Sequence, residues 1–495
     1  MEGSVAGMKE TRDAGLVPEP VDLLIEHGAV ISMDDEQRII YDGALAIRGA
    51  HIVDVGPASE LGRRYVAARR IDASVKAILP GFVNTHHHFL QNLLKGDRED
   101  LDFPDWIDAV SAPRISMVVS DYQAGRYELQ YHAHRLGCAE ALLGGITCLL
   151  NMEWATHPDL IGVYEEAGLR GVHTLTLTDF DQWGNPGMLL PLEQSFDLAE
   201  RLIDCCAGSR AGLVDFRYGL ACANSCTAPL IQEVRRRASE RRVGIHMHIA
   251  ESEPEWCRMH EQHGCSTIGY LHELGLLGPD VLGAHCIYVS DEDIEIMAGS
   301  GMTVSYCPEC HMKLGLGVSP VPKMLRAGIP VSLGTDGSCN DNMDMLEAAR
   351  CCAFLQRVEN RDPRAISAYQ ALYMATAGGA QALGMWDRIG SLEAGKLADV
   401  VLIDLAGCHV RPINQLVNNL VFAAFAEKDV HTVIVNGQVV VEDRQLLTLD
   451  ARQVLADAEA YAIRRFATAG LEISPFYRDN WNLHREYERG YSWLR

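Results

Sequence analysis

The stretch GFVNTHHH, residues 81–88, is a short apolar run that ends in polar side chains. Seven more runs of this kind follow it: GITCLLN (145–151), GVHTLTL (171–177), VDFRYGLA (214–221), VGIHMHIAE (243–251), VLGAHC (281–286), MTVSYC (302–307) and PVSLGTD (330–336). Stretches with a helical pattern separate them, such as APLIQEVRRRASE (228–240). Eight such β/α units in roughly 300 residues predict an α/β fold, a (β/α)8 barrel of the TIM type over residues 81–388. The competing doubly wound sheet would place a glycine-rich phosphate loop after its first strand, and the sequence has none there.

Short alternating strands flank the barrel segment on both sides. They cover residues 21–80 and 389–449, and Asn436-Gly437 between two of them is a strong hairpin signal. We therefore predict a small β-sandwich domain built from both segments. Residues 1–20 are expected to form a flexible tail. Residues 450–495 are expected to begin as a helix and to end in an aromatic tail that either packs on its own subunit or contacts another one.

Composition and charge indicate the class of partner. The chain has 495 residues and a formal net charge of −24, so it has no basic stripe to attract nucleic acid or an acidic membrane. Its first 20 residues have no signal-peptide core, and no window is apolar enough for a membrane helix. We expect a cytosolic enzyme acting on a small molecule, with its fifteen cysteines kept as thiols.

Polar side chains gather at the ends of four predicted strands, where a barrel carries its active site. His86 and His88 are two apart and so share one face of their strand, and His248 lies at the end of another. His285 and Asp336 end two further runs. Histidines and a carboxylate that converge in this way predict a metal site, because imidazole and carboxylate are ligands of zinc.

These motifs resemble the amidohydrolase superfamily, and within it the mononuclear-metal branch of cytosine, guanine and S-adenosylhomocysteine deaminases and triazine hydrolases. The resemblance runs from PGFVNTHHHFLQ (80–91) through HIAE (248–251), AHC (284–286) and LGTDGSCNDNMDML (333–346) to GSLEAGKLADVVLID (390–404). It implies that the metal ligands are His86, His88, His248 and Asp336. It also implies that Glu251 is the proton shuttle and that His285 holds the attacking water or the substrate.

The same resemblance bears on the number and kind of metal ions. Binuclear members carry a carboxylated lysine on the fourth strand, and the run VDFRYGLA has no lysine. One divalent ion is therefore expected, zinc first, with iron, manganese or cobalt as alternatives. Asp336 can take a proton from a metal-activated water while Glu251 gives one to the substrate. His246 lies one layer below His248 and is expected to support the site or the core.

Candidate substrate contacts lie on the loops after the first, fourth and seventh strands. They are Gln91, Phe103, Trp106, Asn224, Tyr306, Cys310 and His311. The last three belong to YCPECHMKL (306–314), where many members of the branch have a segment like HNPxSNxKL. The spacing CPECH also matches haem attachment, which the cytosolic setting disfavours, and a CxxC redox pair, which the missing thioredoxin-like context disfavours. A role in the substrate pocket or in shaping its loop is therefore expected.

The predicted activity is hydrolytic deamination of a nitrogen heterocycle of the purine, pterin, pyrimidine or s-triazine type. An alternative keeps the site and removes a substituted amine, a chloride or a urea-type group from a heterocycle or xenobiotic. A third reading is a non-catalytic binding protein on the same scaffold, which the complete set of candidate residues disfavours. The resemblance also implies a homo-oligomer.

Overall fold

A parallel sheet of eight strands forms the centre of the protein in a computed structural model, which describes residues 18–180 and 185–471. In spatial order the strands run β13-β12-β11-β10-β9-β8-β7-β6, each hydrogen-bonded to the next in parallel register. Their bounds are β6 Phe82–His87, β7 Ile146–Glu153, β8 Arg170–Leu177, β9 Val214–Leu220, β10 Gly244–Ile249, β11 Val281–His285, β12 Thr303–Tyr306 and β13 Val331–Leu333. These are the eight runs predicted from the sequence, so the barrel is confirmed.

The two edge strands of this sheet meet and nearly close the barrel. Past the end of β13, the backbone N–H groups of Thr335 and Asp336 both donate to the carbonyl of His86, at 3.1 and 2.9 Å. The Thr85 hydroxyl bonds the Leu333 carbonyl at 3.0 Å. Closure therefore joins the first and last strands at the end of the barrel that carries the polar residues.

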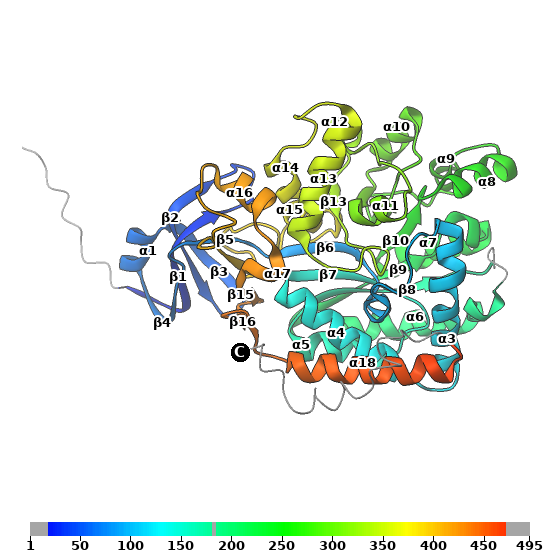
Figure 1. Cartoon of the computed structure of the whole chain (residues 1–495), viewed down its shortest axis with the longest axis horizontal. Helices are drawn as coiled ribbons and strands as arrows, with labels where there is room; N and C mark the ends of the chain where they lie inside the picture. Colours follow the sequence, from blue (N-terminus) through cyan, green and yellow to red (C-terminus); the bar gives the residue numbers. More distant parts are fainter. Residues whose placement is uncertain (1–17, 181–184, 472–495) are drawn as a thin grey trace, which may run out of the picture.

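Helices surround the barrel and cover its apolar outer surface (Figure 1). Their bounds are α2 Phe103–Trp106, α3 Ala112–Gln123, α4 Glu128–Leu143, α5 Ile161–Ala167, α6 Leu192–Ala207, α7 Ala228–Arg241, α8 Glu253–His263, α9 Thr267–Glu273, α10 Asp291–Ser300, α11 Pro308–Lys313, α12 Val321–Arg326, α13 Met345–Asn360, α14 Ala368–Met374 and α15 Ala377–Ala382. Several begin at side-chain caps, such as Ser290 before α10 and Asp344 before α13. Within the described ranges, no helix is long and apolar enough to cross a membrane.

A second sheet, at one end of the molecule in Figure 1, combines strands from both sides of the barrel segment. Its strands are β1 Glu19–Ile31, β2 Ile39–Arg48, β3 His51–Pro57, β4 Tyr65–Asp72, β5 Lys76–Pro80, β14 Val400–Asp404, β15 Val430–Val435, β16 Gln438–Glu442 and β17 Gln445–Leu446. The short helices α1 Ala58–Arg64, α16 Leu416–Ala423 and α17 Ala426–Asp429 are interspersed. The predicted hairpin is present, since Asn436 and Gly437 connect β15 and β16 with φ angles of 53° and 77°.

The nine strands form one continuous sheet that folds back on itself and buries apolar side chains in more than one cluster. The β5 strand pairs antiparallel with β14, with Ile78 opposite Leu402. At the far edge of the sheet, the N–H of Ile52 donates to the carbonyl of Lys396 at 2.9 Å, next to the start of β14. This contact brings the two ends of the sheet together, so that the sheet resembles the predicted sandwich. It differs from a true sandwich in that one continuous sheet replaces two separate ones.

A buried ion pair connects this sheet to the barrel. Arg170, at the start of β8, donates to both carboxylate oxygens of Asp399 at 2.8 and 3.1 Å. Asp399 also accepts the backbone N–H of Asn436 at 2.7 Å. Both members of the pair are almost fully buried, so this contact locks the sheet to the end of the barrel opposite the strand carboxyl ends.

The helix after the second sheet, α18 Ala451–Thr468, lies along the outside of the barrel against α4 (Figure 1). Arg465 forms an ion pair with Asp121 at 2.8 Å. The predicted helix that starts after Asp450 is therefore present. The predicted N-terminal tail, except residues 18–20, and the aromatic residues from Phe476 to Trp493 lie outside the described ranges.

Candidate active site

Four metal-ligand candidates converge at the carboxyl ends of the barrel strands. The ligand atoms of His86, His88 and His248 lie within 4.8 Å of one another. Asp336 follows β13, and its Oδ1 lies 3.4 Å from Nε2 of both His86 and His88. The structure thus brings together three imidazoles and one carboxylate from β6, β10 and β13.

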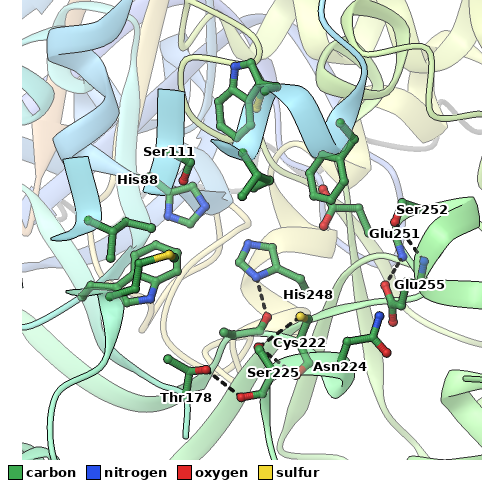
Figure 2. Close-up of a pocket in the computed structure, with 18 of the residues that line it drawn as sticks. His88, Ser111, Thr178, Cys222, Asn224, Ser225, His248, Glu251, Ser252 and Glu255 are labelled. Carbon is green, nitrogen blue, oxygen red and sulfur yellow. Dashed lines mark hydrogen bonds between the residues drawn. The ribbon is translucent and has the colours of Figure 1, made fainter. Parts of the chain in front are cut away.

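Hydrogen bonds at the far side of two of these rings fix which nitrogen is available. His88 Nδ1 donates to the carbonyl of Met152 and His248 Nδ1 to that of Ala221, each at 2.7 Å. A carbonyl only accepts, so the proton sits on Nδ1 and Nε2 keeps its lone pair. Burial lowers the pKa of His88 to about 4 and that of His248 to about 3, so both rings are neutral. Figure 2 shows both side chains at the cavity.

An unusual backbone conformation at Asp336 directs its carboxylate toward His86 and His88. Its φ of 59° is in the left-handed region, which a residue other than glycine adopts only when its surroundings fix it. The carbonyl of His86 fixes its N–H, and its Oδ1 accepts the N–H of Gly337 at 2.8 Å. Although burial acts in the opposite direction, the nearby imidazoles hold the pKa of Asp336 well below its usual value, and the group is a carboxylate.

The donor set fits a divalent metal ion. Three imidazole nitrogens and a carboxylate oxygen are ligands that zinc takes in hydrolytic sites. Nε2 of His86 is buried and makes no hydrogen bond within the described part of the chain, as expected of an atom that binds a metal. The residues present would therefore hold zinc or a similar ion.

Glu251 and His285 lie next to these four residues. Glu251 Oε1 is 3.6 Å from His285 Nε2, which in turn is 3.9 Å from Asp336 Oδ2. The carboxylate of Glu255 accepts the backbone N–H groups of Ala250 and Glu251, at 3.1 and 2.9 Å, and so fixes the loop that carries the acid. Burial, with Asp336 and Glu255 close by, raises the pKa of Glu251 well above its usual value. Glu251 therefore keeps its proton to a higher pH than an ordinary glutamate.

His285 also has an unusual backbone and an unusual partner. Its φ is 73°, which turns the side chain toward the other site residues at the end of β11. Its Nδ1 lies 3.1 Å from Nε2 of His311. Burial keeps the pKa of His285 well below its usual value, so the ring is neutral.

A cavity of about 930 Å³, open to solvent, adjoins these residues (Figure 2). Four of the predicted substrate contacts line it: Gln91, Phe103, Trp106 and Asn224. The sequence did not single out other lining residues, among them Trp154, Phe180, Ile115, Met188, Leu189 and Ser252. Trp154 comes directly after β7, so inspecting the residues past that strand could have identified it. The cavity wall is largely apolar and aromatic, which suits a flat ring.

The remaining three predicted contacts do not line this cavity. The Tyr306 hydroxyl accepts a hydrogen bond from Gln356 Nε2 at 3.2 Å, away from the cavity. Cys310 and His311 are buried in α11, which begins directly after Cys307. In the CPECH stretch, Cys307 lies near His86 and Asp336, whereas Cys310 lies near His285 and Asp336. The stretch therefore borders the metal-ligand candidates, and none of these three residues lines the cavity.

Comparisons with known proteins agree with this geometry. A model of the Amidohydrolase family matches residues 77–440. The 5-methylthioadenosine/S-adenosylhomocysteine deaminase of Syntrophobacter fumaroxidans is 33% identical over 437 residues, which cover 88% of this chain and 96% of that protein. The crystal structure of an adenosine deaminase from Xanthomonas campestris with bound zinc superposes with a TM-score of 0.83 at 28% identity, covering 91% of this chain and 100% of that one. The atrazine chlorohydrolase of Arthrobacter aurescens in complex with zinc gives a TM-score of 0.80 at 25% identity, covering 89% of this chain and 100% of that one.

Proposed function

Because the chain belongs to the amidohydrolase family, we propose that it is a zinc-dependent aminohydrolase that removes an exocyclic amino group from a purine-type ring. In the overall reaction, water and the amino-substituted ring give the oxo-substituted ring and ammonia. The names of the relatives support the reaction and the ring class, since deaminases of adenosine-type substrates are among them.

The observation that carries the proposal is the position of the Glu251 acid. It is a buried carboxyl with a raised pKa at the cavity wall, 3.6 Å from His285 and beside the metal-ligand candidates. A deaminase needs a group that gives a proton to the ring nitrogen next to the carbon under attack. A carboxyl whose pKa is raised by burial keeps its proton to a higher pH than an ordinary glutamate and so suits this role.

The other residues have complementary roles. A bound metal ion would lower the pKa of the attacking water to about 7. Asp336 accepts the proton that this water loses, because its carboxylate is ionised and is oriented by Gly337. His285 Nε2, between Glu251 and Asp336, holds the attacking oxygen in line with the ring carbon. The hydroxyl of the adduct then returns a proton to Glu251, and Asp336 passes on to the amine the proton that it accepted, so that the amine leaves as ammonia and both carboxyl groups are restored.

Polar atoms in the apolar cavity can orient the ring. Gln91 Oε1 accepts the N–H of Ser338 at 2.9 Å, which fixes the amide so that Nε2 is the donor available to a ligand. Oδ1 of Asn224 and Nε1 of Trp154 are buried and make no hydrogen bond within the described ranges, although both residues line the cavity. Gln91 Nε2 is thus a candidate donor to the ring, whereas the two unpaired atoms of Asn224 and Trp154 have almost no surface open to the cavity.

The direct test is ammonia release by the zinc-loaded enzyme. The panel contains adenine, adenosine, 5′-methylthioadenosine, guanine, an aminopterin ring, cytosine and an amino-s-triazine at equal concentrations. We expect turnover to be highest on one of the purine compounds. Release of ammonia only from the pyrimidine or triazine would contradict the ring class, and the absence of release from every compound would contradict deamination.

A second candidate keeps the site and changes the leaving group. The likeness to the atrazine chlorohydrolase favours it, because that protein has the same fold and also binds zinc. Chloride and alkylamine release from chlorinated and alkylamino s-triazines, measured in the same experiment, distinguishes it from deamination. The cytosolic location and the homo-oligomeric assembly predicted from the sequence stay predictions.

A further inference from the structure

The three imidazoles among the metal-ligand candidates, His86, His88 and His248, differ in what contacts their Nδ1 atoms. For His88 and His248 it is a backbone carbonyl. For His86 it is another side chain, because Nδ1 of His86 lies 2.8 Å from Nε2 of His246. Each of these two nitrogens can donate or accept, so the contact alone does not say which ring carries the proton.

The contact of the other ring nitrogen of His246, Nδ1, shows which ring carries the proton. Its Nδ1 lies 3.0 Å from the carbonyl of Leu282, on the neighbouring strand β11. Since the carbonyl can only accept, the proton of His246 is on Nδ1 and its Nε2 carries a lone pair.

The tautomer of His246 in turn determines the tautomer of His86. Facing an acceptor at 2.8 Å, His86 must carry its own proton on Nδ1, which leaves the lone pair on Nε2. That is the buried atom with no hydrogen bond, 3.4 Å from Asp336 Oδ1. A chain of two hydrogen bonds, from the Leu282 carbonyl through His246 to His86, thus makes the third imidazole a competent ligand.

We propose that His246 is a positioning residue of the metal centre, which sets the tautomer and the ring orientation of His86 and thereby the affinity for the metal ion. This role rests on the metal site of the proposed function but not on its substrate. It also explains why a polar ring is fully buried on β10, two residues before His248, where an aliphatic side chain would otherwise pack.

The test measures metal affinity in a matched set of variants. His246→Leu removes the acceptor and keeps an apolar side chain of similar size. His246→Gln keeps an acceptor oxygen near the position of Nε2. His173→Leu is the control, because His173 is an equally buried histidine, on β8, that bonds Thr156 and Tyr164 and no residue of the donor set. For each protein, the zinc dissociation constant is obtained by chelator competition, and thermal unfolding of the metal-free form checks the fold.

We expect His246→Leu to weaken zinc binding by about 10- to 100-fold, the effect typical of losing a partner that orients a ligand. His246→Gln should recover most of that loss, and His173→Leu should bind zinc as the unmodified protein does. Unchanged affinity in His246→Leu, or equal loss in both His246 variants, would overturn the proposal. Loss of affinity in His173→Leu would do so too, because any buried histidine would then have the same effect.

A second measurement does not depend on any variant folding. Long-range ¹H–¹⁵N spectra of the metal-free, histidine-labelled protein report which nitrogen of each ring is protonated. We expect protons on Nδ1 of both His246 and His86, and a proton on Nε2 of His246 would refute the relay. If the unmodified protein bound no zinc at all, the proposed function would fail as well, whereas normal zinc binding with an unaffected His246→Leu would remove only this inference.

Discussion

Replacing Glu251 with glutamine tests the assignment of the acid most directly. The change is isosteric and removes only the proton that the carboxyl can give. The backbone N–H of Glu251 stays bound to Glu255, so the loop keeps its anchor. The four metal-ligand candidates are not altered, because Glu251 is not one of them.

The expected effect follows from the size of general acid catalysis. A well-placed acid contributes about 10²- to 10⁴-fold to the rate, which corresponds to about 3 to 5.5 kcal/mol of the activation barrier. We expect kcat of Glu251→Gln to fall within that range. KM should change little, because the amide can still contact the ring, and the zinc content should equal that of the unmodified enzyme.

The assay is steady-state ammonia release with the best substrate of the panel, together with metal analysis of each protein. Glu253→Gln is the matched control, since Glu253 is an exposed glutamate in the first turn of α8 and does not line the cavity. It should retain full activity. A Glu251→Gln enzyme with full zinc content and a kcat close to that of the control would refute the assignment of the proton donor.

Three further predictions concern the metal, the pH dependence and the link between the two sheets. His88→Ala removes one of four donors, and we expect loss of both zinc and turnover, measured by metal analysis and ammonia release. Burial raises the pKa of Glu153 from 4.5 to about 7, so the folded state holds a proton that the unfolded chain has lost. Stability should therefore fall by about 3 kcal/mol as the pH rises from 4.5 through 7, and urea unfolding of Glu153→Gln should lack this slope. Arg170→Leu leaves the buried Asp399 carboxylate unpaired and should cost about 3 to 5 kcal/mol in the same assay, with partial recovery in a double variant that also carries Asp399→Leu.

The sequence was sufficient for the barrel and for the residues at its strand ends. Strands such as β6 and β10 have short apolar runs with a period of two, and their position in the chain determines at which end of the barrel they finish. That topology places His86, His88, His248 and Asp336 at one end of the barrel, together with His285, and the resemblance to the amidohydrolase superfamily identified the four ligands among them. This is why the donor set could be predicted without knowing any distance.

The cavity wall could not be predicted in the same way. Phe180 and Met188 reach the cavity from the loop between β8 and α6, and the path of a loop depends on packing between distant segments. Cys310 and His311 were expected at the substrate, but the helix that starts at Pro308 buries them both. A local pattern shows that a helix can begin there and does not show which of its faces the rest of the fold will cover.

The pairing of β5 with β14 sets an order of events during synthesis. Ile78 meets its partner Leu402 only after the whole barrel segment between them has been made. At ribosomal rates of 5–20 residues per second, the edge of β5 waits roughly 15 to 65 seconds for that partner. During this interval an apolar strand with unpaired backbone groups is open to other chains, which is the situation in which nascent proteins aggregate or recruit chaperones. The β14 strand thus covers the edge of β5 that was exposed until then. If a ribosome stalls before Val400, the released product keeps that edge unpaired.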